Sequence, residues 1–382
     1  MTVSPLHATL RRHVEAGTVP GAVGLVARGD DVEVVAVGHT DVEGSASMAR
    51  DSLFRIASVT KPITAAAVLM LVDEGRIGLG DPVADWLPEL AKPMVVRTPA
   101  SPVDDVVPAV RPVTVEDLLS FRSGWGLAAD FALPAVRALS AVQDHSRPFG
   151  DWPDPDTWLG LLAQVPMLHQ PGEAWLYGTS SALQGILVAR VSGRTLPDFL
   201  AERIFEPLGM RDTAFEVPAP KRHRFTSSYA PAADGTLRLT DTPDGAYSSL
   251  PGFPSGGGGL VSTADDWLAF GRLLLNAGAA PDGRRLLTAT SVSRMTTNHL
   301  TAAQRESAAL FLEGQGWGYG GSVDVTPAGP WSVPGRYGWV GGTGTTAHLV
   351  PATGTVTVLM TQAAMTSPAP TAMMRDFWRV AA

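Results

Sequence analysis

The sequence predicts an α+β fold, in which an antiparallel sheet flanked by helices is joined to a mainly helical lobe. Short β-branched segments lie near both ends of the chain, whereas helical periodicity dominates its middle. The 382 residues also exceed what one hydrophobic core usually holds. We therefore expect residues 1–75 and 255–382 to form one lobe around a shared sheet and residues 76–254 to form the helical lobe, with a ligand site in the cleft between them.

The N-terminal part predicts a hairpin and then a buried helix. The expected elements are an amphipathic helix over 6–16 and strands over 21–28 and 32–38. Gly-Asp-Asp at 29–31 separates the strands and is typical of a hairpin turn. The next helix begins at Ser58 and ends near Gly75, and its nearly continuous apolar run over 62–72 indicates burial on all sides.

The rest of the chain passes from loops to helices and back to strands. A proline-rich loop is expected over 82–112. Helices are expected over 115–120, 156–164, 180–192, 196–205 and 263–276, strands over 345–350 and 355–360, and a last helix over 370–380. No internal repeat interrupts this order, so the strands at the end can return to those at the start.

The composition excludes several classes of partner. The net charge is −8 and the chain has no run of lysine and arginine, which argues against nucleic acid and acidic membrane surfaces. The absence of cysteine excludes disulfides and thiolate chemistry. The longest apolar run, 63–72, is too short to cross a bilayer, and no signal peptide is recognisable, so the expected location is the cytoplasm.

Ser58 and Lys61 are the first candidate pair. Lys61 is one of only three lysines, and it opens the apolar helix three residues after Ser58. Residues three apart share a helix face, so the hydroxyl and the amine could lie within hydrogen-bonding reach. A desolvated lysine can act as a base near neutral pH, and a serine beside such a base is an activated nucleophile. Alternatively, Ser58 only caps the helix and Lys61 points to water.

Tyr177 is a second candidate, because it stands directly before the helix expected at 180–192. There it could shuttle a proton between the Ser58 oxygen and a leaving group. Taken without the other two residues, it is more typical of a core aromatic whose hydroxyl bonds to the backbone.

The glycine-rich stretch over 337–345 combines small residues with the large indole of Trp339 at a strand edge. Glycines let the backbone approach a ligand closely, and a strand-edge N–H can polarise an acyl carbonyl. The alternative is a tight turn with a packed tryptophan. Its Gly-x-Gly pattern does not open a helix in a βαβ unit, which excludes dinucleotide binding. The eight histidines are scattered singly and do not predict a zinc cluster; His348, on an expected strand, is more typical of packing than of catalysis.

The order of these motifs resembles the serine β-lactamase and penicillin-binding-protein superfamily, within it the class C-like branch that includes family VIII carboxylesterases and related acyltransferases. The motifs are Ser58-Val59-Thr60-Lys61, Tyr177-Gly178-Thr179 and Trp339-Val340-Gly341, supported by Phe54-Arg55-Ile56-Ala57, Asp117-Leu118-Leu119-Ser120, Pro207-Leu208-Gly209-Met210 and Gly257-Gly258-Gly259-Leu260. The resemblance covers nearly the whole chain and implies a β-lactamase/transpeptidase-like fold.

The resemblance also implies roles for individual residues. Ser58 would be the acylated nucleophile, Lys61 its base partner and Tyr177 the proton shuttle, with the backbone N–H groups of Ser58 and Gly342 as the oxyanion hole. No metal or organic cofactor is implied.

Two positions depart from the β-lactamase pattern. Thr179 replaces the asparagine of Tyr-x-Asn, and Trp339 replaces the lysine or histidine of the third motif. The apolar Trp339 resembles the esterase branch and suits an uncharged acyl or alcohol group. The remaining candidates for substrate contact are Gly341, Trp125, Trp175, Phe253 and Trp317, although ordinary packing is the more usual role of such aromatics.

The sequence thus predicts a serine hydrolase that cleaves carboxylic esters of small molecules or transfers their acyl group to an alcohol. One alternative is a β-lactamase or an amide hydrolase acting on D-amino-acid peptides. Another is a binding module of the same fold without catalysis, against which the joint presence of serine, lysine and tyrosine argues. The sequence does not predict an oligomeric state.

Overall fold

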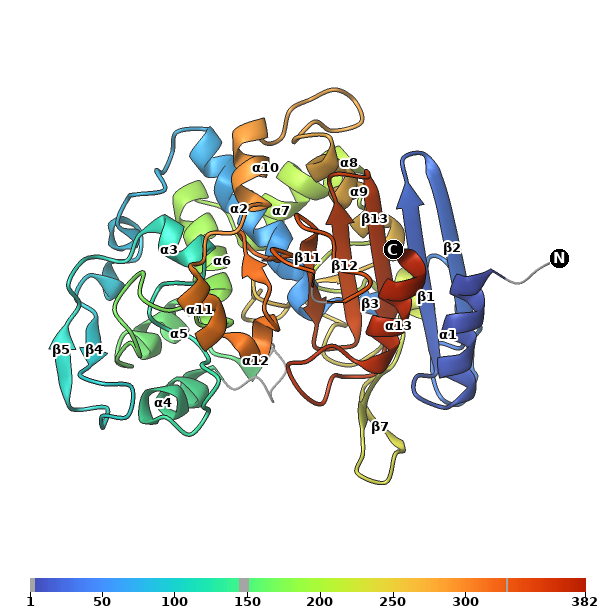
Figure 1. Ribbon diagram of the computed structural model, residues 1–382, viewed down its shortest axis with the longest axis horizontal. Coiled ribbons are helices and arrows are strands. Elements are labelled where there is room, and N and C mark those ends of the chain that lie inside the picture. Colours follow the sequence, from blue (N-terminus) through green and yellow to red (C-terminus); the bar gives the residue numbers. More distant parts are fainter. Residues whose placement is uncertain (1–3, 144–150, 328) are drawn as a thin grey trace.

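A seven-stranded antiparallel sheet forms one side of the molecule in the computed structural model, which describes residues 4–143, 151–327 and 329–382 (Figure 1). Within these residues the strand order is β2-β1-β13-β12-β11-β10-β9. The strands are β1 (Gly21–Arg28), β2 (Asp31–Gly38), β9 (Gly316–Trp317), β10 (Ser322–Val323), β11 (Tyr337–Gly341), β12 (Thr345–Val350) and β13 (Thr355–Thr361). Because β1 pairs with β13, the two ends of the chain share one sheet, as the sequence predicts.

Both faces of this sheet are covered. Alternate residues of β1 face opposite sides: Val23 and Leu25 belong to the main core, whereas Ala22 and Val26 pack in a second cluster with the terminal helices. These helices are α1 (Pro5–Glu15) and α13 (Ala372–Ala381), which lie side by side in front of the sheet (Figure 1). Helix α9 (Ala264–Leu275), whose N-cap is Thr263, packs on β13, β1 and β12 on the main-core side.

A buried helix, α2 (Lys61–Asp73), lies at the centre of the molecule (Figure 1). Its residues from Lys61 to Leu71 are all buried, which explains why its apolar residues show no preferred face. It packs against α6 (Thr179–Ser192). The other helices are α3 (Val115–Leu119), α4 (Pro134–Val142), α5 (Pro155–Leu162), α7 (Leu196–Leu200), α8 (Glu206–Leu208), α10 (Ala289–Met295), α11 (Ala302–Ser307) and α12 (Ala309–Leu312).

Short strands and tight helices connect these elements. The pairs are β3 (Phe54–Arg55) with β8 (Val261–Ser262), β4 (Met94–Val96) with β5 (Val106–Pro108) and β6 (Ser228–Pro231) with β7 (Leu237–Asp241). The 3₁₀ helices described are Ala57–Thr60, Val83–Asp85, Pro88–Leu90 and Ala219–Arg224.

Two predicted elements need correction. The segment over 82–112 is not only loop, because it contains β4, β5 and two 3₁₀ turns. The helix predicted over 196–205 is α-helical only to Leu200 and continues as a π-helix over Ala201–Phe205 before α8. Pro207 lacks an N–H for the regular helical bond to the residue four before it, which accounts for the altered winding.

One buried apolar cluster runs from Val23 and Val358 of the sheet through α2 to Leu187 of α6. The boundaries of the two lobes therefore remain a prediction. In the described part of the chain, no helix combines the length and the apolarity that a membrane span requires.

Candidate active site

Ser58 lies in a 3₁₀ turn between β3 and α2, not in the first turn of the α-helix. Side chains three residues apart eclipse each other in a 3₁₀ helix, so the turn aligns Ser58 with Lys61. The residue before Ser58, Ala57, has φ +43°, a left-handed conformation that is strained for a residue with a Cβ. The turn thus presents the Ser58 side chain from a constrained backbone.

Neighbouring segments hold this turn in place. The hydroxyls of Thr343 and Thr345 donate to the carbonyls of Arg55 and Ile56, at 2.5 and 3.0 Å respectively. The Arg55 side chain is buried and bonds to Asp241 at 2.6 Å. The turn after β11, the first residue of β12 and the last residue of β7 therefore fix the backbone just before the candidate nucleophile.

Lys61 is buried beside Ser58, with 3% of its surface exposed. Its Nζ lies 2.8 Å from Ser58 Oγ and donates to the carbonyl oxygen of Gly257 at 2.5 Å. It also lies 4.9 Å from the centre of the Tyr177 ring. Burial lowers the pKa of Lys61, and the nearby Tyr177 only partly offsets this effect. Lys61 therefore loses its proton at a lower pH than a lysine in water does.

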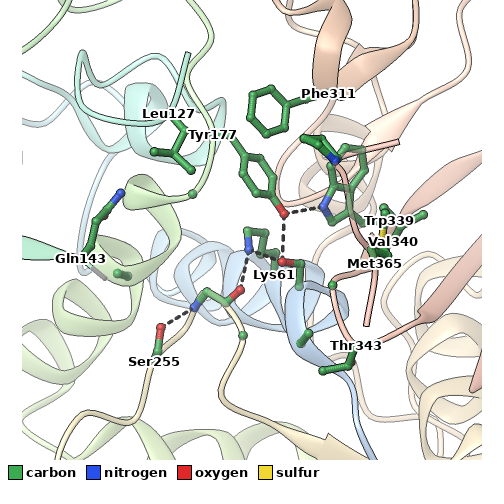
Figure 2. A pocket seen from close by; sticks show the side chains of 18 of the residues that line it. Lys61, Leu127, Gln143, Tyr177, Ser255, Phe311, Trp339, Val340, Thr343 and Met365 are labelled. Carbon is green, nitrogen blue, oxygen red and sulfur yellow. Dashed lines mark hydrogen bonds between the residues drawn. The ribbon is translucent and has the colours of Figure 1, made fainter. Parts of the chain in front are cut away.

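Tyr177 reaches the same oxygen from the segment that leads into α6. Its backbone pairs with Leu127, and Gly178 caps α6 directly after it. The phenol donates to Ser58 Oγ at 2.9 Å and accepts from the indole Nε1 of Trp339, also at 2.9 Å (Figure 2). Ser58, Lys61, Tyr177 and Trp339 thus form one continuous hydrogen-bonded chain.

These side chains line a cavity of about 480 Å³. Its wall is mostly apolar, and Lys61 is the one charged residue among the described residues that line it. The lining includes Leu127, Phe131, Gln143, Trp152, Ala182, Ser255, Phe311, Trp339, Val340, Gly342, Thr343 and Met365. The Phe311 ring stacks on Tyr177 with ring centres 5.0 Å apart. The cavity is large enough for a small organic molecule.

Gly341 and Gly342 differ in their surroundings. A Cβ on Gly341 would lie 2.5 Å from the carbonyl oxygen of Ile56, so only glycine lets β11 come this close to the turn before Ser58. A Cβ on Gly342 would meet nothing within 4 Å, and Gly342 lines the cavity together with Ser58. The two N–H groups named for the oxyanion hole thus belong to residues of the same cavity wall.

Several residues predicted to contact substrate lie behind the cavity wall instead. Trp339 lines the cavity, whereas the buried Trp125 donates its indole N–H to the Val165 carbonyl at 2.8 Å. Phe253 packs between Trp152 and Trp158. Trp125 and Phe253 are buried because packing in the core removes more of their apolar area from water than a position on the cavity wall would.

Trp317 and Trp175 are likewise buried, and they stack around the aromatic residues that line the cavity. Trp317 meets Trp339 edge-on, with ring centres 4.8 Å apart. Thr179 is also absent from the lining: it is 1% exposed and donates its hydroxyl to Gln143 Oε1 at 2.8 Å. Trp317, Trp175 and Thr179 therefore support residues of the wall.

The sequence did not point to Leu127, Gln143, Phe311 or Met365, although all four line the cavity. Each lies far in the chain from the recognised motifs or in a segment without a strong pattern. His348 is buried near Trp378, and burial with the nearby Arg336 lowers its pKa well below the usual value. Among the described residues, no group of three or more histidine, aspartate or glutamate side chains is placed to hold a metal ion.

Comparison with known sequences identifies similar proteins over nearly the whole chain. The family model described as Beta-lactamase matches residues 6–376. An uncharacterized protein of Mycobacterium tuberculosis is 38% identical over 353 residues, which cover 88% of this chain and 86% of that protein. Esterase EstB of Burkholderia gladioli is 33% identical over 321 residues, covering 78% and 74%. Penicillin-binding protein 4 of Amycolatopsis lactamdurans is 30% identical over 370 residues, covering 94% and 84%.

Solved structures show the same fold. EstCE1, described as a hydrolase with promiscuous acyltransferase activity, superposes with a TM-score of 0.79 at 23% identity, covering 99% of this chain and 97% of that one. Unliganded simvastatin synthase LovD of Aspergillus terreus gives a TM-score of 0.79 at 22% identity, again covering 99% and 97%. The predicted β-lactamase/transpeptidase-like fold is thereby confirmed.

Proposed function

Because the chain belongs to the Beta-lactamase family of serine hydrolases, we propose that it cleaves carboxylic esters, or transfers their acyl group to an alcohol, through a covalent intermediate on Ser58. The observation that carries this proposal is the position of Ser58 Oγ. It lies 2.8 Å from Lys61 Nζ and 2.9 Å from the Tyr177 hydroxyl, at the wall of a mostly apolar cavity.

In the acylation step, Ser58 Oγ attacks the ester carbonyl carbon and gives up its proton. The lowered pKa of Lys61 favours a neutral amine, which can accept that proton while its own N–H still bonds to Gly257. The proton passes to the leaving alcohol through Tyr177, whose oxygen bonds to both Ser58 and Trp339. The C–O bond to the alcohol breaks and the acyl group stays on Ser58.

In the second step, water or another alcohol releases the acyl group by the reverse proton path. The N–H groups of Ser58 and Gly342 stabilise the negative oxygen of both tetrahedral intermediates. The close approach of Gly341 to Ile56 supports this role, because it sets the strand carrying Gly342 against the turn carrying Ser58.

The charge of the cavity favours esters over β-lactams and peptides. A carboxylate on the substrate would need a cation, and Lys61, the charged side chain among the described lining residues, is already bonded to Ser58 and Gly257. Trp339 provides an apolar surface at the position where the β-lactamase motif has a cation. The named relatives include both an esterase and a penicillin-binding protein, so the two substrate classes need a direct comparison.

The deciding experiment measures hydrolysis of p-nitrophenyl acyl esters, nitrocefin and a D-alanyl-D-alanine peptide by the same preparation. We expect turnover of the esters and much slower turnover of the other two substrates. Ser58→Ala should lose ester turnover and should no longer gain mass from a fluorophosphonate reagent. Ser293→Ala, a change at an exposed serine of α10, should keep both properties. Ester turnover that survives in Ser58→Ala would disprove the proposal.

A further inference from the structure

The side chain of Gln143 places a buried amide at the cavity wall, and its amino group has no partner among the described residues. Gln143 lines the cavity but is only 1% exposed, and its Nε2 has no hydrogen-bond partner among the described residues. Leaving a buried amide donor unpaired is energetically unfavourable. A donor kept in this state at a cavity wall is well suited to a partner supplied by a bound molecule.

Thr179 fixes the orientation of this amide. Its hydroxyl donates to Gln143 Oε1 at 2.8 Å, so the oxygen end is occupied, whereas the buried Nε2 has no partner among the described residues. Both residues belong to helix ends: Gln143 is the C-cap of α4 and Thr179 is the first residue of α6. The donor is therefore held by two backbone elements.

Gln143 contributes a hydrogen-bonding group to a cavity wall that is mostly apolar. Figure 2 shows Gln143 across the cavity from Trp339, with Lys61 between them. The wall also contains Leu127 and Ala182, which offer no hydrogen-bonding side chain. The motif position that usually carries an amide holds Thr179 here, and this threonine instead orients an amide from another segment.

We propose that Gln143 Nε2 donates a hydrogen bond to an oxygen of the ester outside the scissile group, and that the enzyme therefore prefers esters carrying a second carbonyl or ether oxygen. The proposal rests on the proposed esterase function and names its substrate class. Gln143 is a specificity-determining residue and Thr179 a positioning residue.

The test uses a plain alkyl ester and matched esters in which a ketone replaces one methylene, moved stepwise along either the acyl or the alcohol part. The native enzyme should turn over at least one keto ester with about tenfold higher kcat/KM than the plain ester, as one hydrogen bond provides. Whether that ester carries its ketone on the acyl or the alcohol part identifies the side that Gln143 contacts.

Gln143→Met, which has a similar length but no donor, should abolish this preference by lowering kcat/KM for the keto ester to the value for the plain ester. Gln143→Glu should also abolish it, because the acceptor for Thr179 remains while the donor is lost. Thr179→Val should weaken the preference although Gln143 is intact, and Thr179→Ser should retain it. Thermal melting of each variant checks that the fold is preserved.

The outcomes separate the two proposals. A native enzyme that hydrolyses the plain ester without preferring any keto ester would overturn the role of Gln143 alone. A preference that persists in Gln143→Met would do the same. Failure of the native enzyme to hydrolyse any ester would overturn the esterase proposal on which this inference rests.

Discussion

The protonation of Lys61 should control both activity and stability. Burial lowers its pKa in the folded protein, so the ester kcat/KM should rise with pH as the amine loses its proton, along a limb centred below the ordinary lysine value. Lys61→Met should reduce kcat by at least about a hundredfold at every pH, because the base is lost.

The lowered pKa of Lys61 also determines how the stability of the protein depends on pH. At a pH between the lowered pKa and the ordinary value, the unfolded chain binds a proton that the folded chain does not, so the native protein loses stability as the pH falls through that window. In Lys61→Met this position binds no proton in the folded or the unfolded state. The difference in melting temperature between this variant and the native protein should therefore shift in favour of the variant as the pH falls. Lys92→Met, at an exposed position, should show no such trend. The same pH trend in Lys61→Met and Lys92→Met would contradict the lowered pKa of Lys61.

Trp339 should matter through its N–H as well as through its ring. Trp339→Phe removes the bond to the Tyr177 hydroxyl but keeps an aromatic wall, and we expect kcat to fall about tenfold. Trp317→Phe is a matched control, because the buried Trp317 indole N–H has no partner among the described residues. Equal losses of kcat in the two variants would show that packing, not the hydrogen bond, matters.

At the scale of secondary structure, the fit between β11 and the turn at Ser58 depends on Gly341. Gly341→Ala would place a Cβ 2.5 Å from the Ile56 carbonyl oxygen, so the strand must move away from the turn. Ester turnover should fall by more than about tenfold, since misplacing a catalytic group by an ångström can cost that much or more, and the melting temperature should drop. Gly160→Ala in α5, where a Cβ meets nothing within 4 Å, should leave turnover unchanged and raise stability slightly. Full activity in Gly341→Ala would contradict the proposed fit.

Strand β12 carries a second titrating group, on the face covered by α13. Burial and the nearby Arg336 lower the pKa of His348 well below its usual value, so the folded protein keeps this histidine neutral. As the pH falls through the ordinary histidine range, the unfolded chain gains a proton that the folded chain does not, and stability is lost at up to about 1.4 kcal/mol per pH unit. His348→Gln should flatten this acid-side loss in melting temperature, whereas His223→Gln, at an exposed position, should not. An unchanged slope in His348→Gln would contradict this assignment.

At the scale of the whole molecule, the sequence predicted more of the fold than of the cavity. Short β-branched segments in 21–38 and 345–361 are local signals, and they located the strands that join the chain ends. The serine, lysine and tyrosine motifs are also local, and the structure brings these three side chains together.

The cavity wall could not be read in this way, because it is assembled from distant segments. Phe311, Gln143 and Leu127 belong to no shared motif, and only the packing of their elements places them beside Ser58. Trp125 and Phe253, which the sequence suggested for substrate contact, lie close in sequence to recognised motifs and are buried outside the cavity lining. Proximity in sequence to a motif does not determine whether a side chain faces the cavity or the core behind it.

The pairing of β1 with β13 has a consequence for how the chain matures. Arg28 and Thr355 are neighbours across these strands, so the sheet cannot close until the chain has been made through β13. Contacts this distant in sequence slow folding and leave the inner edge of β1 open to association with other chains meanwhile. The surroundings of the Ser58 hydroxyl are completed at the same stage, because Trp339 lies on β11 and Gly342 directly follows this strand. During refolding, reactivity toward fluorophosphonate should therefore appear after helical circular dichroism has recovered, marking the moment when the last hairpin docks.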